Sequence, residues 1–320
     1  MVSPSSPSVT GVRVRVPAKI NLALKVGARR ADGFHPLATI YQAVSLYDEV
    51  VAEWAAADEF TVTVTGEGAD QVPTDETNLA VRAARLLARV HGVHDALGVS
   101  LTLKKAIPVA GGLAGGSSNG AAALLACAVL WDLDVPADGL RALAADLGSD
   151  VPFALLGGTA LGSGRGEEVV PALTTGSYHW VLAFGWRGLS TPAVYRRFDE
   201  LSAPAGTSDA AALPVPTVPE VPTELMNALR GGHAAEVGCA LSNDLQAAAL
   251  DLQPQLRRTL QAGLDYGALG ALVSGSGPTC AFLVADESAA VDLSVALSGE
   301  GVCRAVRRAV GPVPGARVVG

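Results

Sequence analysis

A glycine-rich turn that opens into a long apolar helix is the feature that most limits how this chain can fold. The stretch reads GGLAGGSSNG from Gly111 to Gly120 and continues into an Ala/Leu segment that ends near Trp131. Glycines let a backbone turn sharply and approach a ligand closely, and free N–H groups at a helix start favour an anion. The pattern predicts a phosphate-binding loop, with a helix entry that only packs against a neighbour as the alternative.

The loop fits neither of two common phosphate-binding motifs. Four residues separate Gly111 from Gly116, as in a Walker A motif, but Ser117 and Ser118 stand where that motif needs lysine. No acidic residue ends a following strand at the distance that a Rossmann fingerprint requires. Positive charge must therefore come from other segments, while a serine hydroxyl is a candidate ligand of phosphate or magnesium.

Lysines are rare in this chain, and their positions indicate where that charge comes from. The four lysines are Lys19, Lys25, Lys104 and Lys105, and all lie in or just before the two segments that look like ligand loops. Lys19 and Lys105 are the candidates for contact with the phosphates.

The pattern around the loop predicts mixed α and β structure. Alternating apolar and polar residues over 12–28 predict two strands, or one strand with a break. A 3.6-residue apolar rhythm further on predicts a helix capped by Asp75 or Thr77.

A second series of strands and helices begins near Tyr178, which suggests two lobes. We expect an α+β fold with an N-terminal lobe of residues 1–172 and a C-terminal lobe of residues 173–320. The prolines between residues 202 and 222 predict a loop or linker inside the second lobe.

Composition limits the class of partner. A net charge of -8 argues against broad nucleic-acid binding, which needs a basic face, but leaves room for a small anionic ligand. No apolar run reaches the roughly 20 residues of a membrane-spanning helix, and the N-terminus lacks the regions of a signal peptide. The four cysteines are scattered and predict buried free thiols. We expect a soluble cytoplasmic protein without nucleic-acid or membrane partners.

Three segments together resemble the motifs of the GHMP kinases, a family of small-molecule kinases. They are PAKINL (Pro17 to Leu22), PVAGGLAGGSSNGAA (Pro108 to Ala122) and VSGSGPTCAF (Val273 to Phe282), and the resemblance covers nearly the whole chain. It implies a nucleotide lobe of the ribosomal-protein-like β-α kind, a ferredoxin-like C-terminal lobe and an active site between them. It also implies ATP as the phosphoryl donor, together with Mg²⁺.

Within the family, the chain is most similar to the branch that phosphorylates the 2-hydroxyl of 4-diphosphocytidyl-2-C-methyl-D-erythritol in the non-mevalonate route to isoprenoids. The segment from Pro17 to Val50, which contains RRADGFHPL, carries most of this likeness. DETNLAVRAARLL, LGSDVPFAL and LSNDL are also similar. The implied partner is a small cytidine-diphosphate polyol, and a homodimer is an open option.

Two other functions compete with this one. A homoserine or mevalonate kinase would use the same fold, but those substrates lack the base that the DGFH element, with Phe34, would hold. A catalytically silent nucleotide-binding protein is the second alternative, and the retention of both Lys19 and Asp150 argues against it.

The resemblance implies a role for the two catalytic candidates. Asp150 matches the aspartate that orients the acceptor hydroxyl and takes its proton, and Lys19 would hold Asp150 ionised and stabilise charge on the transferring phosphate. This is direct in-line transfer without a phospho-enzyme. A helix cap is the alternative for Asp150, and a solvated strand-end lysine is the alternative for Lys19.

The remaining site residues follow from the same match. The nucleotide would be held by Asn78, Lys105, Pro108, Gly111, Gly112, Leu113, Ala114, Gly115, Gly116, Ser117 and Ser118, with Ser117 as the magnesium ligand. The substrate would be held by Asn21, Phe34, His35, Asp150, Tyr195, Gly275, Ser276 and Gly277. Phe34 and Tyr195 would sandwich the cytosine and His35 would hydrogen-bond to it. A core phenylalanine and a surface histidine are the alternatives.

Three departures from the family pattern stand out. Phe34 replaces the usual tyrosine, which removes a hydroxyl and keeps the aromatic face. Gly120 replaces an alanine in the first turns of the helix, at a local cost of up to about 1 kcal/mol. No glutamate can be placed that completes a magnesium site.

Overall fold

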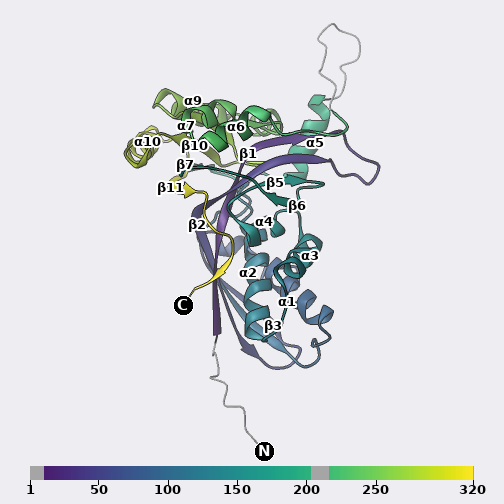
Figure 1. Ribbon diagram of the computed structural model, residues 1–320. Helices are drawn as coiled ribbons and strands as arrows, with labels where there is room; N and C mark the ends of the chain where they lie inside the picture. The colour runs from purple at the N-terminus through teal and green to yellow at the C-terminus, as the bar shows by residue number, and fades with distance from the viewer. Residues whose placement is uncertain (1–10, 203–215, 320) are drawn as a thin grey trace, which may run out of the picture.

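The computed structural model describes residues 11–202 and 216–319, which form two lobes around two β-sheets (Figure 1). The N-terminal lobe contains β1 (Gly11–Val26), β2 (Leu37–Ala55), β3 (Phe60–Gly66), a short 3-10 helix (Ala69–Gln71), α1 (Leu79–Val90), β4 (Gly98–Lys105), α2 (Gly115–Leu130), α3 (Ala137–Leu147), α4 (Val151–Leu156), β5 (Thr159–Ser163) and β6 (Glu168–Pro171). The remaining elements are β7 (Tyr178–Phe184), α5 (Thr191–Ser202), α6 (Thr223–Gly231), α7 (Ala234–Ala240), β8 (Ser242–Asn243), α8 (Gln246–Leu252), α9 (Gln255–Asp265), β9 (Gly270–Val273), β10 (Cys280–Val284), α10 (Glu287–Glu300), β11 (Ala305–Gly311) and β12 (Arg317–Val318).

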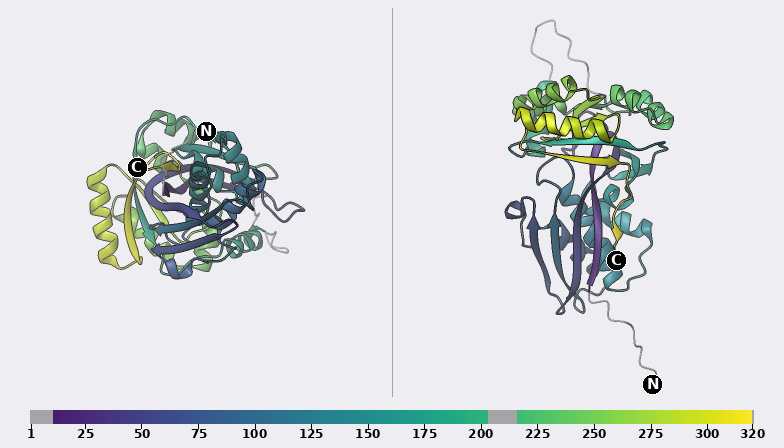
Figure 2. Two further views of the ribbon diagram at one scale, coloured as in Figure 1. Left: turned by 90° about the horizontal axis from the view of Figure 1, so that it is seen from below. Right: turned by 90° about the vertical axis from the view of Figure 1, so that its left-hand side faces the viewer.

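The first sheet has eight strands in the order β12-β1-β2-β4-β3, with β5 and β6 extending from β2 and with β8 beside β1. Helices α1 to α4 cover one of its faces, as both Figure 1 and Figure 2 show. The core between sheet and helices consists mostly of alanine, valine and leucine. Small alanines on α1 and α2 let these helices approach each other and the sheet closely.

Strand β1 is one long strand interrupted by two register shifts, so the predicted break is real and lies inside a continuous strand. The shifts fall between Pro17 and Ala18 and between Asn21 and Ala23. Such bulges bend a strand and re-aim its side chains. The first half of β1 packs in the core of the N-terminal lobe, and the second half packs against the C-terminal sheet. The bulged segment, which carries Lys19, therefore lies where the lobes meet.

The second sheet has four antiparallel strands in the order β11-β7-β10-β9. Its strands and helices follow one another as β7, helices, β9, β10, α10 and β11, which is the ferredoxin-like arrangement. Helices cover the face of this sheet that points away from the N-terminal lobe (Figure 2). The expected two-lobed α+β fold is confirmed. A boundary at residues 172/173 falls between the two sheets, and it stays a prediction because β1, β2 and β12 pack across it.

Some local predictions differ from the structure. The side chain that caps α1 belongs to Asn78, whose Oδ1 accepts the Ala80 N–H at 2.9 Å, so the assignment of the cap to Asp75 or Thr77 is wrong. Asp75 instead accepts hydrogen bonds from Thr77 in the preceding turn. Most of the proline-rich stretch, residues 203–215, and the first ten residues lie outside the described residues.

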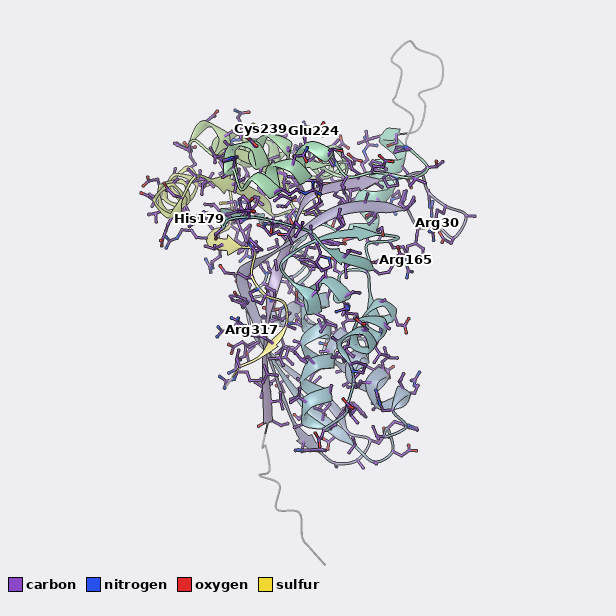
Figure 3. The ribbon with its side chains drawn as sticks, viewed as in Figure 1. Arg30, Arg165, His179, Glu224, Cys239 and Arg317 are labelled. Carbon is purple, nitrogen blue, oxygen red and sulfur yellow. The ribbon has the colours of Figure 1, made fainter. Side chains whose placement is uncertain are left out.

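The prediction of buried thiols holds for Cys127, Cys280 and Cys303, and it is wrong for Cys239, which is exposed on α7 (Figure 3). Among the helices that the structure describes, none is both long and apolar enough to span a membrane.

Candidate active site

The segments that carry the sequence motifs meet around a cavity of about 870 Å³. Lys19 and Asn21 line it from β1, and most residues of the glycine-rich loop between Pro108 and Ser117 line it as well. Gly275 and Ser276 of the second glycine turn close it from the other lobe. Three stretches that are far apart in the sequence therefore form one site at the junction of the lobes.

The two glycine turns touch each other through their backbones. Gly112 has φ +78°, and a Cβ at this position would overlap the carbonyl oxygen of Ser274. The Ser274 hydroxyl also donates to the Gly112 carbonyl at 3.1 Å. A Cβ on Gly275 would lie 3.4 Å from both Lys19 Nζ and Asn21 Oδ1. The glycines are required here because backbone packs on backbone beside the buried lysine.

The start of α2 has the properties of an anion site. The helix begins at Gly115 after Ala114, which has φ 60°, and no side chain caps it. A Cβ on Gly116 would meet open space, so the backbone of the first turn is accessible from the cavity. Unpaired N–H groups and the positive end of the helix dipole favour a phosphate there.

The two serines of the loop have different surroundings. The Ser118 hydroxyl is buried and donates to the Pro17 carbonyl at 2.9 Å, so it connects α2 to the PAKIN segment. Ser117 lines the cavity. Ser117 is therefore the hydroxyl available to a phosphate oxygen or to a magnesium ion.

Lys19 and Asp150 meet in the wall of the cavity. Lys19 Nζ lies 3.5 Å from Asp150 Oδ2 and donates to Asn21 Oδ1 at 2.7 Å. Asp150 occupies the N-cap position of α4, but its side chain makes no capping hydrogen bond. The carboxylate is therefore directed to Lys19 and the cavity, and capping is not its role.

A chain of hydrogen bonds sets the orientation of the Asn21 amide. The Thr39 hydroxyl donates to the Ala23 carbonyl at 2.6 Å, so it can only accept from Asn21 Nδ2, at 2.8 Å. The amide oxygen of Asn21 is then left for Lys19. This arrangement directs one Lys19 proton to Asn21 and leaves the others for Asp150 and a ligand.

Tyr41 forms part of the wall beside this pair. Its ring stacks on Phe153 with centroids 4.8 Å apart, and Lys19 Nζ lies 5.4 Å from the ring centroid. Burial and the nearby Asp150 carboxylate raise the pKa of the Tyr41 hydroxyl well above its usual value. Tyr41 therefore keeps its proton at neutral pH and adds no charge to the site.

A second group of cavity residues is aromatic. Phe34, His35 and Tyr195 all line the cavity, and the His35 and Tyr195 rings lie 5.2 Å apart at 30°. His35 Nε2 is 2.7 Å from Asp199 Oδ1, so the ring nitrogen is the donor and the carboxylate the acceptor. His35 is buried whereas Phe34 is 52% exposed, the reverse of a core phenylalanine and a surface histidine.

Lys105 is not brought to the cavity. Its Nζ pairs with the carboxylate of Asp48 and donates to Asn119 Oδ1 at 2.9 Å, and its side chain is 2% exposed. Asp48 also accepts the backbone N–H groups of Ala106 and Ile107. The charge of Lys105 is thus neutralised beneath the loop, which leaves Lys19 as the lysine that lines the cavity.

Four other predicted residues do not line the cavity. Asn78 uses its amide within the α1 cap, where Nδ2 donates to the Pro73 carbonyl at 2.6 Å. Leu113 lies in the core, and its carbonyl accepts the Lys19 N–H. Gly277 lies within its turn, where its N–H donates to the Ser274 carbonyl, and Ser118 is held by Pro17 as described above.

Several lining residues were not identified from the sequence. They are Arg29, Tyr41, Arg165, Thr191, Arg196 and Asp199. Arg29 lies near the DGFH element, and Thr191, Arg196 and Asp199 lie on α5 with Tyr195, so proximity to a predicted residue was the available signal for these four. Tyr41 and Arg165 lie on elements whose approach to the cavity depends on the fold.

Comparison with known proteins agrees with this geometry. Family models described as "GHMP kinases N terminal domain" and "GHMP kinases C terminal" match residues 78–158 and 225–303. A 4-diphosphocytidyl-2-C-methyl-D-erythritol kinase of Mycolicibacterium gilvum is 55% identical over 96% of this chain and 92% of its own length. The chain belongs to the GHMP kinases.

Other relatives support the family assignment. A 4-diphosphocytidyl-2-C-methyl-D-erythritol kinase of Mycobacterium tuberculosis is 53% identical over 96% of this chain and 93% of its own. The crystal structure of a 4-(cytidine 5'-diphospho)-2C-methyl-D-erythritol kinase has a TM-score of 0.72 at 33% identity, covering 93% of this chain and 98% of that one. A homoserine kinase from Cytophaga hutchinsonii has a TM-score of 0.76 at 19% identity with both chains fully covered, and this likeness concerns the fold alone. As a GHMP kinase, the protein is an ATP-dependent small-molecule kinase.

Proposed function

We propose that this GHMP kinase transfers the γ-phosphoryl group of ATP to the 2-hydroxyl of 4-diphosphocytidyl-2-C-methyl-D-erythritol, a step in the non-mevalonate route to isoprenoids. The observation that carries the proposal is the layout of one cavity. The cavity is lined both by a lysine–aspartate pair, Lys19 and Asp150, and by an aromatic set with a buried histidine. Such a cavity suits a substrate that carries both a reactive hydroxyl and a base.

The roles of the side chains follow from their positions. Asp150 orients the acceptor hydroxyl and takes its proton as the phosphoryl group transfers, and Lys19 stabilises negative charge on the oxygens nearby. The backbone N–H groups at the start of α2 hold the phosphates of ATP. Phe34 and Tyr195 bind the cytosine by stacking, and His35 by hydrogen bonding. The transfer is direct and needs no covalent intermediate on the protein.

The cavity suits a magnesium ion that is held by only a few protein ligands. Mg²⁺ keeps several waters and is commonly bound by substrate phosphates and one or two protein oxygens. Among the residues that the structure describes, no cluster of three or more ligating side chains gathers. Ser117 is the hydroxyl at the helix start that lines the cavity. Bound Mg²⁺ would neutralise charge on the phosphates of ATP.

The enzyme's setting is part of the same proposal. The net charge of -8 and a cavity that fits a small molecule support a small-molecule substrate without nucleic-acid or membrane partners, in the cytoplasm. A homodimer is compatible with this activity and is not required by it.

ATP consumption against a panel of acceptors tests the proposal. The panel contains 4-diphosphocytidyl-2-C-methyl-D-erythritol, mevalonate, homoserine and galactose, with product phosphorylation confirmed by mass spectrometry. We expect turnover of the cytidine compound alone. Turnover of homoserine or mevalonate without the cytidine compound would refute the proposed substrate, and no turnover of any acceptor would favour a silent nucleotide-binding protein.

A further inference from the structure

Arg165 lines the cavity and has no role in the assignments above. It lies in the turn between β5 and β6, and its guanidinium carbon is 5.1 Å from the centroid of the Phe34 ring. Figure 3 shows Arg165 beside the β5–β6 hairpin, near the loop between β1 and β2 that carries Arg30. The arginine therefore reaches from the β5–β6 turn to the aromatic ring of Phe34 in the loop between β1 and β2.

Two contacts hold Arg165 in place. Its Nε donates to Glu167 Oε1 at 3.3 Å, and its backbone N–H donates to Glu167 Oε2 at 2.6 Å. The cation–π contact with Phe34 adds a third point of support for the guanidinium. Since Glu167 engages Nε, the two terminal nitrogens remain as donors on a side chain that is 41% exposed.

The position of Arg165 along the cavity is fixed by its neighbour. The Gly166 carbonyl accepts the Tyr41 hydroxyl at 3.4 Å, and a Cβ on Gly166 would overlap that hydroxyl. Tyr41 in turn lies under Lys19. Arg165 thus contacts Phe34 directly and is linked through Gly166 and Tyr41 to the Lys19–Asp150 pair.

In the proposed substrate, a diphosphate joins the cytidine to the part that carries the acceptor hydroxyl, and this diphosphate corresponds in position to Arg165. If cytosine binds at Phe34 and the acceptor hydroxyl lies at Asp150, the diphosphate that joins the two parts must pass the wall between them. A guanidinium is a planar fork of donors that matches phosphate oxygens, and charge-assisted bonds of this kind are strong. Arg29 and Arg196 also line the cavity but are more exposed, and Arg29 Nε donates to the Gly33 carbonyl.

We propose that Arg165 binds the diphosphate of the substrate and so makes the enzyme specific for a nucleoside diphosphate conjugate. This inference rests on the proposed function. Arg165 contributes to substrate binding and takes no part in proton or phosphoryl transfer. Glu167 and Phe34 position it before the substrate arrives, which lowers the entropy lost on binding.

The test compares Arg165→Gln with the wild type. We expect the KM for the cytidine-diphosphate conjugate to rise about 10- to 100-fold, with kcat changed less than about threefold and the KM for ATP unchanged. Arg165→Lys keeps the charge but loses the fork, so we expect an intermediate rise. Arg30→Gln is the matched control, since Arg30 is an exposed arginine of the same region, paired with Asp32 and outside the cavity lining.

A binding experiment isolates the diphosphate. The dissociation constants of cytidine and CDP are measured by calorimetry with the ATP site saturated by a non-hydrolysable ATP analogue. In the wild type and Arg30→Gln, CDP should bind at least tenfold more tightly than cytidine. In Arg165→Gln this ratio should fall toward one, while cytidine itself loses no more than about threefold. Thermal melting of each variant checks that it is folded.

The possible results separate this inference from the proposed function. An unchanged CDP-to-cytidine ratio in Arg165→Gln overturns the inference, and so does an equal loss for both ligands, which would limit Arg165 to supporting Phe34. If the wild type binds no cytosine ligand and does not phosphorylate the conjugate, the proposed function fails and the inference fails with it. If the wild type does both, only the role of Arg165 is in question.

Discussion

At the scale of single residues, two aspartates occupy the same position at a helix start and do different things. Asp286 caps α10 by accepting the Ala289 N–H at 2.9 Å, whereas Asp150 makes no capping bond on α4 and faces Lys19 instead. A carboxylate without a structural partner beside a buried lysine is available for chemistry. The helix that follows Asp150 begins without its help, because Pro152 favours a first helical turn.

This difference predicts opposite effects of removing each carboxylate. Asp150→Asn should lower kcat about 10²- to 10⁴-fold and leave the melting temperature nearly unchanged, since a general base is lost and no cap is. Asp286→Ala should lower the free energy of unfolding by about 1 kcal/mol and keep full kcat. Steady-state kinetics and denaturant unfolding measure both. An Asp150→Asn enzyme with near-wild-type turnover would remove Asp150 from the mechanism.

At the scale of elements, one buried carboxylate connects three segments around the glycine-rich loop. Asp48 on β2 pairs with Lys105 at the end of β4, accepts the Ala106 and Ile107 N–H groups, and accepts Asn119 Nδ2 from α2 at 2.9 Å. The carboxylate is fully buried, and every contact is a charge or a hydrogen bond. This network holds the loop and the start of α2 against the sheet.

Lys105→Met should therefore destabilise the protein and not primarily weaken ATP binding. Removing the lysine leaves Asp48 as an uncompensated buried charge, at an expected cost of about 3–5 kcal/mol in the free energy of unfolding. Lys104→Met is the matched control because Lys104 is exposed, and it should change stability by less than about 0.5 kcal/mol. Urea unfolding and the KM for ATP, measured for both variants, distinguish a structural role of Lys105 from a role in ATP binding. A raised KM for ATP with an unchanged free energy of unfolding would mean that Lys105 binds the phosphates.

At the scale of the whole molecule, the site exists because the two lobes share strands. Strand β1 runs from one lobe into the other (Figure 1), and β12 returns from the C-terminal end to pair with β1. The two glycine turns make contact at Gly112 and Ser274. Residues of both glycine turns line the cavity, so its shape depends on the contact between them. Small shifts between the lobes would therefore move Gly275 relative to Lys19 and the helix start.

Gly112→Ala tests this dependence. The added Cβ meets the Ser274 carbonyl, so the turns must separate, and a displacement of about 1 Å at a reactive centre can cost up to 10²-fold. We expect kcat/KM to fall about 10- to 100-fold. Gly92→Ala has a similar positive φ of 66° with nothing near the added Cβ, and it should cost only about 1–2 kcal/mol in stability. Equal activity losses in both variants would mean that backbone strain, and not contact between the turns, is responsible.

The sequence by itself determined the features that depend on local chemistry. The glycine turn before the apolar helix, the break in the first strand, the two-lobed α+β fold and the GHMP kinase motifs were all predictable, because turns, helix starts and apolar periodicity are set by neighbouring residues. The structure brings Lys19, Asp150 and the aromatic residues named by the motif match together around one cavity, and their roles stay predictions.

Only the tertiary structure decided which partner each side chain has. Lys105 carries the same charge as Lys19, yet it pairs with Asp48, 57 residues away in sequence, and does not reach the site. Ser117 and Ser118 are adjacent, yet the Pro17 carbonyl occupies one of the two hydroxyls. Arg165 contacts Phe34 from the β5–β6 hairpin, which is far in sequence from the DGFH element that carries Phe34. The residue type sets the charge and the hydrogen-bonding capacity of a side chain. Contacts between distant segments decide whether the protein satisfies them or leaves them for a ligand.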